Sequence, residues 1–206
     1  MTINKYEEMN EMELDILKEI GSIGGGNAAT ALSSMLNAKV TMKVPEVKIM
    51  EFNEAMEHLG HPEDLVAAIF VEMSADIEGI MLFILTKEFS DEVLTRILGK
   101  ECAEFLELGE IESSVLTEIG NIVISSYITA MSSLTNVDVD LSVPQFTVNM
   151  LGGVMSLPIA VMGVDSDRIM MITGEFKIDG KELDSDMLLL PDVKSLNVLM
   201  KKLGVE

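Results

Sequence analysis

The sequence predicts an α+β fold in which helices pack on a largely antiparallel sheet and two similar halves are related by pseudo-two-fold symmetry. The first observation is an internal repeat: residues 14–50 match residues 113–149 without a gap, and 13 of these 37 pairs are identical. The second is that each copy passes from a helical apolar period to a strand-like alternation. A weaker similarity joins the runs that end at Gly99 and Gly204. We therefore expect one domain over residues 1–206, with halves at about 10–105 and about 109–206, and not a long-period solenoid.

The first helix is predicted from its start signal and its apolar spacing. Asn10 and Glu13 have the spacing of a capping box, and apolar residues then recur every three or four positions. We expect this helix to run to about Asn37. Its equivalent in the second half is expected to begin near Glu110.

A strand of alternating character should follow each long helix, at 40–44 and at 139–143. Pro45 and Pro144 come directly after these segments. Because proline cannot donate a hydrogen bond to a sheet, we expect an edge or a bulge at both places.

The rest of the first half reads as a strand pair followed by a helix. Apolar runs at 65–73 and 77–85 are separated by a short turn around Ala75 and Asp76, which favours antiparallel pairing. Helices at 90–98 and 194–203 are then expected to end the two halves.

The charge balance excludes some classes of partner. The chain has 14 Lys and Arg against 35 Asp and Glu, a net charge of −21. Binding of nucleic acid depends on neutralising phosphates with basic side chains, so we expect no nucleic-acid partner. A partner with an acidic site must be recognised by local fit.

Cysteine content and hydropathy indicate a cytoplasmic protein without membrane insertion. The lone cysteine, Cys102, cannot form an internal disulfide and is interpreted as a small core residue. Uncharged stretches at 20–38, 119–137 and 141–164 contain polar residues or prolines and have no adjoining basic cluster, so we expect them in a packed interior. The acidic start of the chain does not resemble a secretory signal.

Two segments resemble ligand-binding motifs, but a structural role explains each of them better. The glycine-rich segment at 21–27 lacks the preceding strand and following lysine of a nucleotide site, and close helix packing explains it better. His58 and His61 lie near acidic residues, but without further clustered ligands a solvated loop is the better interpretation than a metal site.

The candidate site lies on the second long helix. Glu118 and Asn121 are three residues apart and so share one face of that helix, where both can address the same bound group. Ser114 and Ser125 lie on the same side. A carboxylate beside an amide suits the positioning of a water molecule more than the ligation of a metal.

At these residues the chain resembles a known family. The order Ser114, Glu118, Asn121 and, after 22 further residues, Pro144 resembles the active-site motif of the CheC phosphatases of bacterial and archaeal chemotaxis. The first half repeats the motif as Asp15, Glu19, Ser22 and Pro45. The resemblance is closest to CheC, since the related CheX is expected to be shorter and FliY to carry an extra C-terminal domain.

The resemblance implies removal of phosphate from the phospho-aspartate of a CheY-like response regulator. The receiver domain would supply its own Mg²⁺ and lysine, so this chain needs no cofactor of its own and delivers an aligned water. Asn121 would hold that water in line with the phosphorus, and Glu118 would bond the receiver's lysine.

The first half departs from the motif, because Ser22 replaces the amide with a shorter side chain. A misplacement of about 1 Å can cost on the order of a hundredfold in rate, so we expect a weak or silent first site at Glu19 and Ser22. The main alternative is a non-catalytic regulator that binds the receptor deamidase CheD, a partner that the resemblance also implies. A metalloenzyme that uses the His58 region is a third class.

Overall fold

The two halves of the chain fold in the same order of elements. The computed structural model describes residues 9–101, 104–162 and 168–204. The first half contains α1 (Glu11–Leu36), β1 (Val40–Met42), β2 (Glu46–Glu51), α2 (Phe52–Leu59), β3 (Leu65–Ala75), β4 (Gly79–Leu85) and α3 (Lys87–Leu98). A short 3-10 helix, η2 (Phe105–Glu107), leads into the second half.

The second half repeats this order element by element. It contains α4 (Glu110–Thr135), β5 (Val139–Leu141), β6 (Gln145–Met150), α5 (Leu151–Met162), β7 (Arg168–Ile178), β8 (Lys181–Pro191) and α6 (Val193–Lys202). The predicted long helices and the antiparallel pairing of β3 with β4 are confirmed. The short helices α2 and α5 were not predicted.

Local signals fix the ends of the long helices. The Asn10 side chain accepts a hydrogen bond from Glu13 N, and the Glu13 carboxylate accepts one from Asn10 N, so the predicted capping box is present. Asn37 and Asn136 end α1 and α4 in the left-handed conformation, with φ of 47° and 53°. Each residue is the 99-residue counterpart of the other, so the repeat includes the C-terminal caps of the two helices.

The sheet joins the two halves by exchanging strands. Its order is β1-β7-β8-β4-β3-β5, with β2 also paired to β7 and β6 also paired to β3. Every pairing among the described strands is antiparallel. The first strands of each half therefore pair with a hairpin of the other half, and β4 meets β8 in the centre.

The two prolines interrupt the outer strands as expected. Between the pairs Met42–Phe176 and Glu46–Thr173, three residues of the first half face two residues of β7. The same three-against-two arrangement occurs beside β3, between Leu141–Met73 and Gln145–Phe70. Pro45 and Pro144 each occupy the last of the three positions, so each half contains a bulge at its proline.

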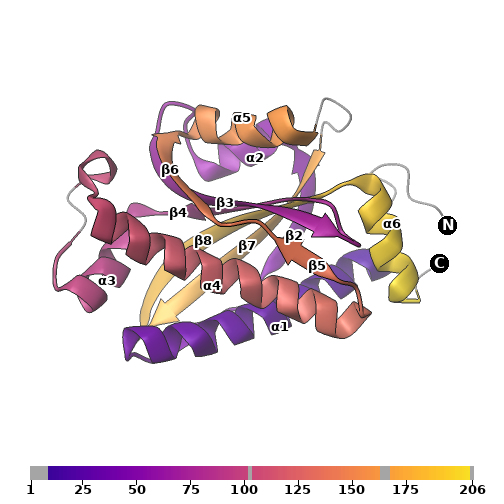
Figure 1. Ribbon diagram of the computed structural model, residues 1–206, viewed down its shortest axis with the longest axis horizontal. Coiled ribbons are helices and arrows are strands. Elements are labelled where there is room, and N and C mark those ends of the chain that lie inside the picture. Colours follow the sequence, from indigo (N-terminus) through magenta and orange to yellow (C-terminus); the bar gives the residue numbers. More distant parts are fainter. Residues whose placement is uncertain (1–8, 102–103, 163–167, 205–206) are drawn as a thin grey trace.

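The sheet is covered on both faces (Figure 1). Helices α1 and α4 lie side by side on one face, with α3 and α6 beside the ends of the sheet, and they share one apolar core with it. Helices α2 and α5 cover the other face and form a second core, which includes Ala55, Leu151, Val154 and Met155. Because both faces are buried at the centre of the sheet, the central strand β4 is apolar throughout its length, with the run GIMLFIL.

The glycine-rich segment lies inside α1 and allows that helix to approach α4. A Cβ atom on Gly24 would lie 2.7 Å from Tyr127 Cα, which is closer than packed atoms can come. Gly25 would meet the Met42 sulfur, to which Tyr127 donates its hydroxyl hydrogen at 3.6 Å. Burial raises the pKa of Tyr127 above its usual value. Close helix packing is therefore the role of these glycines, as the sequence indicated.

The expectations for the two histidines, for Cys102 and for membrane spanning can also be compared with the structure. His58 lies on α2 and not in a loop, so that part of the interpretation was wrong, whereas His61 follows the helix. Cys102 lies outside the described residues. In the parts of the chain that the structure describes, no helix is both long enough and apolar enough to cross a membrane.

Candidate functional site

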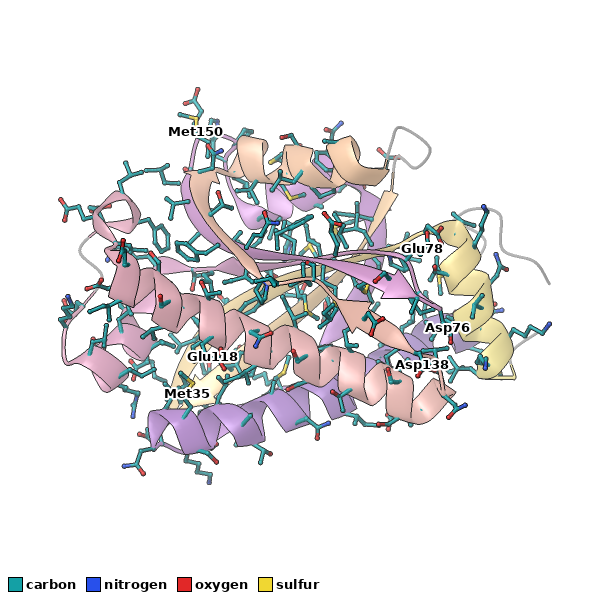
Figure 2. All side chains as sticks on the ribbon, viewed as in Figure 1. Met35, Asp76, Glu78, Glu118, Asp138 and Met150 are labelled. Atoms are coloured by element: carbon teal, nitrogen blue, oxygen red, sulfur yellow. The ribbon has the colours of Figure 1, made fainter. Side chains whose placement is uncertain are left out.

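The site residues of the second half lie along one exposed stripe of α4. Ser114 and Glu118 are exposed, and Asn121 and Ser125 are half-buried on the same side of the helix. This placement follows from the helical period alone, because the opposite side of α4 carries the buried apolar residues Leu116, Ile119 and Val123. Figure 2 shows Glu118 on the part of α4 nearer its start. Asn121 is therefore open to a partner and is not covered by the sheet.

The Glu118 carboxylate is available for a partner's cation. It forms no ion pair and no hydrogen bond with any residue in 9–101, 104–162 or 168–204. Because the protein has a net charge of −21, a cation on a partner would be attracted to this carboxylate.

Two contacts set the position of Asn121. The residue before it, Gly120, allows α4 to lie directly on β3, because a Cβ atom there would be 2.6 Å from the Cγ1 atom of buried Ile69. On the solvent side, the Ser125 hydroxyl donates a hydrogen bond to Asn121 Oδ1 at 3.3 Å. The backbone and the side chain of Asn121 are thus constrained from opposite sides.

The first half has the same layout with weaker chemistry. Glu19 is exposed and Ser22 is half-buried on α1, and exposed Asp15 pairs with Lys18 at 2.9 Å. Gly26 occupies the position that Ser125 has in the second half. No contact equivalent to the bond between Ser125 and Asn121 can form there, since glycine has no side chain.

The two prolines of the motif lie in different surroundings. Pro45 is buried against α1, with its Cγ atom 3.0 Å from where a Cβ atom of Gly21 would be. It therefore lies beside the residue that precedes Ser22. Pro144 is half-buried between β5 and β6. Both prolines thus lie at the strand break of their half, and Pro45 in addition packs against the helix of its site.

Ser125 and Gly120 have contacts at the site that were not predicted from the sequence. A hydroxyl four residues after the amide, on the same helix side, is the signal that points to Ser125. A glycine inside an otherwise apolar helix is the signal of close packing that points to Gly120. Neither signal specifies the contact until the packing of α4 on β3 is known.

The histidines do not assemble a metal site within the described residues. No group of three or more His, Cys, Asp or Glu in that part of the chain is close enough to hold an ion. His58 lies instead 3.9 Å from the Asp186 carboxylate of β8.

Comparison with known proteins finds a family profile that matches both copies of the motif and a relative that covers nearly the whole chain. The profile of the CheC-like family matches residues 12–49 and 111–148, two segments that contain both copies of the motif up to the strand after each proline. The chain is 34% identical over 203 residues to the CheY-P phosphatase CheC of Bacillus subtilis, covering 97% of both proteins. It is 31% identical over 144 residues to the flagellar motor switch phosphatase FliY of the same organism, covering 69% of this chain and 37% of FliY.

Solved structures support the fold. The crystal structure of Thermotoga maritima FliY superposes with a TM-score of 0.79 at 21% identity, covering 96% of this chain and 98% of the other. That superposition agrees in fold with the sequence comparisons. The near full-length similarity to CheC and the two profile matches show that the chain belongs to the CheC-like family.

Proposed function

We propose that this protein hydrolyses the aspartyl phosphate of a CheY-like response regulator in the cytoplasm, through a single active site at Glu118 and Asn121. The observation that carries the proposal is the exposed stripe of α4, where an unpaired carboxylate and a held carboxamide lie within one helical turn of each other. The similarity to a CheY-P phosphatase over 97% of both chains supports the choice of substrate.

The geometry suits delivery of a water molecule. An acyl phosphate is already reactive, so the main requirement is a nucleophile held in line with the phosphorus. The Asn121 carboxamide can both donate to and accept from a water and carries no charge to repel the phosphoryl oxygens. No covalent intermediate on this chain is needed.

Glu118 is assigned to docking. Its carboxylate, which has no partner among the described residues, would accept a hydrogen bond from the receiver's lysine. That contact would orient α4 over the receiver's active site and draw the lysine away from the phosphate. In this scheme the receiver domain supplies the Mg²⁺.

The test is the decay of a phosphorylated receiver domain in Mg²⁺-containing buffer, with this protein at a catalytic ratio. We expect faster phosphate release in the wild type and a loss of about a hundredfold in Asn121→Ala. Glu118→Gln should weaken the apparent affinity for the receiver by about tenfold, the scale of a lost charge-assisted hydrogen bond. The matched changes Ser22→Ala and Glu19→Gln should have little effect.

Two results would contradict the proposal. Equal losses from Asn121→Ala and Ser22→Ala would show that both halves contribute or that neither does. Stoichiometric binding with an unchanged phosphate lifetime would favour a non-catalytic regulator, for which CheD is the candidate partner.

A further inference from the structure

The hydroxyl of Ser125 makes a different hydrogen bond from three other Ser and Thr hydroxyls of α4. Thr117, Ser126 and Thr135 each donate to the backbone carbonyl four residues earlier, at 2.7 Å. This bond is the ordinary choice for Ser and Thr inside a helix. Ser125 donates instead to the side chain of Asn121, at 3.3 Å. Its hydroxyl therefore bonds a residue of the proposed site and not the helix backbone.

This contact restricts the part of Asn121 that matters for the proposed chemistry. The terminal torsion of an asparagine is broad, so a free carboxamide rotates over a wide range. Oδ1 has two lone pairs and Ser125 occupies one of them, which leaves the second lone pair and both Nδ2 hydrogens for a water. A carboxamide that is held in place before the reaction loses less entropy on reaching the transition state.

The first half lacks both members of this pair. Ser22 stands where Asn121 stands, and Gly26 stands where Ser125 stands. Gly26 is exposed, and no atom lies within 4 Å of the position that its Cβ would occupy, so a serine fits there without displacing a neighbour. The missing hydroxyl is therefore a feature of the sequence at this position and not a consequence of crowding.

We infer that Ser125 is a positioning residue that orients the Asn121 carboxamide, and that the first half lacks a two-residue unit and not only an amide. The inference rests on the proposed function, because it assigns Ser125 a role through Asn121.

The loss arm of the test measures kcat and KM for a phosphorylated receiver. Ser125→Ala should lower kcat by about tenfold, the scale of one hydrogen bond, with KM unchanged. Ser125→Thr keeps the hydroxyl and should restore most of the rate. Ser126→Ala is the matched control, because the Ser126 hydroxyl donates to the Ile122 carbonyl and not to a site residue, and it should leave kcat unchanged. In an Asn121→Ala background, Ser125→Ala should cause no further loss.

The gain arm uses the open position in α1. In the Asn121→Ala protein, Ser22→Asn should restore a low rate, and the pair Ser22→Asn with Gly26→Ser should raise that rate by about tenfold. Thermal midpoints of all variants verify that they are folded.

The outcomes separate this inference from the proposed function. If the wild type does not shorten the phosphate lifetime, or Asn121→Ala equals the wild type, the proposed function fails. If Asn121→Ala is inactive while Ser125→Ala keeps the wild-type kcat, only the role of Ser125 is overturned. A Ser125→Thr variant as slow as Ser125→Ala, or equal losses in the presence and absence of Asn121, would also overturn it.

Discussion

Small differences in side-chain reach separate the two halves of the molecule. The polar atoms of Asn121 lie one bond farther from the backbone than the hydroxyl of Ser22, its counterpart on α1. Both helices expose a glutamate one turn earlier, so the carboxylate alone does not distinguish them. In the proposed mechanism the active half is the one in which an amide reaches outward and a neighbouring hydroxyl holds it.

We expect a single, largely buried carboxylate, Asp186, to lower the stability of the fold at neutral pH. Asp186 lies mostly buried on β8, and its Oδ1 atom has no hydrogen-bond partner among the described residues. Burial raises the pKa of Asp186, an effect that protonated His58 opposes and the charge of Asp184 reinforces. An acid whose pKa is higher in the folded state than in the unfolded state destabilises the fold when ionised, and this cost disappears as the pH falls through the raised pKa.

We therefore expect Asp186→Asn to increase the free energy of unfolding by about 1 kcal/mol at neutral pH. The gain should shrink as the pH falls and vanish near the ordinary aspartate pKa of about 4. Urea unfolding at several pH values measures it, and exposed Asp184→Asn on the same strand, which removes only the weaker repulsion between the two carboxylates, should give a smaller gain. A gain that persists unchanged at low pH would show that charge burial is not its cause.

At the scale of single elements, α4 is positioned by one glycine. Gly120 lies between buried Ile119 and the proposed water-positioning Asn121, and it contacts the strand β3 through Ile69. The distance between the helix and the sheet at this point therefore determines how far Asn121 stands out from the protein. A change in the packing of Gly120 should therefore also move the proposed catalytic residue Asn121.

We expect Gly120→Ala to lower the free energy of unfolding by about 1–3 kcal/mol, because its methyl group would overlap Ile69 in a closed core. The same change should slow phosphate release, since α4 must shift to relieve the overlap. Gly26→Ala on α1 is the matched control: it meets no atom within 4 Å and should stabilise the helix by about 0.5–1 kcal/mol. Thermal unfolding of both variants gives the comparison. A neutral Gly120→Ala would show that the contact with Ile69 adapts at no cost.

The sequence predicted the elements that have local signals and missed those that do not. The capping box at Asn10 and the stripe of Glu118 and Asn121 depend only on neighbours within a few turns, so both could be read directly. Helix α5 was missed because it contains Gly152, Gly153 and Pro158, which all disfavour a helix. Its formation follows from burial of Leu151, Val154 and Met155 against the sheet, which is a tertiary effect.

At the scale of the whole molecule, the exchange of strands could not be read from the repeat. Two identical orders of elements are equally compatible with two separate small domains and with an interlocked pair, because strand pairing is a long-range contact. In the structure, β1 and β2 of the first half complete the edge at β7, and β5 and β6 of the second half complete the edge at β3. Each half alone would expose those edges and also the hydrogen-bonding edge of β4 or of β8, which pair with each other in the intact sheet.

We therefore expect the segments 1–101 and 104–206 to be unable to fold separately as monomers, and to form the native structure when they are produced together. The reason is that each hairpin finds its outer strands only in the other half. Circular dichroism and size-exclusion chromatography of each segment, and of the mixture, measure this directly. A mixed complex with cooperative unfolding is the expected result, and the intact chain is the reference. A homodimer of one segment would agree with the same pairing made between two copies. A single segment that unfolds cooperatively as a monomer would contradict it, since its unpaired outer strands would then contribute nothing essential.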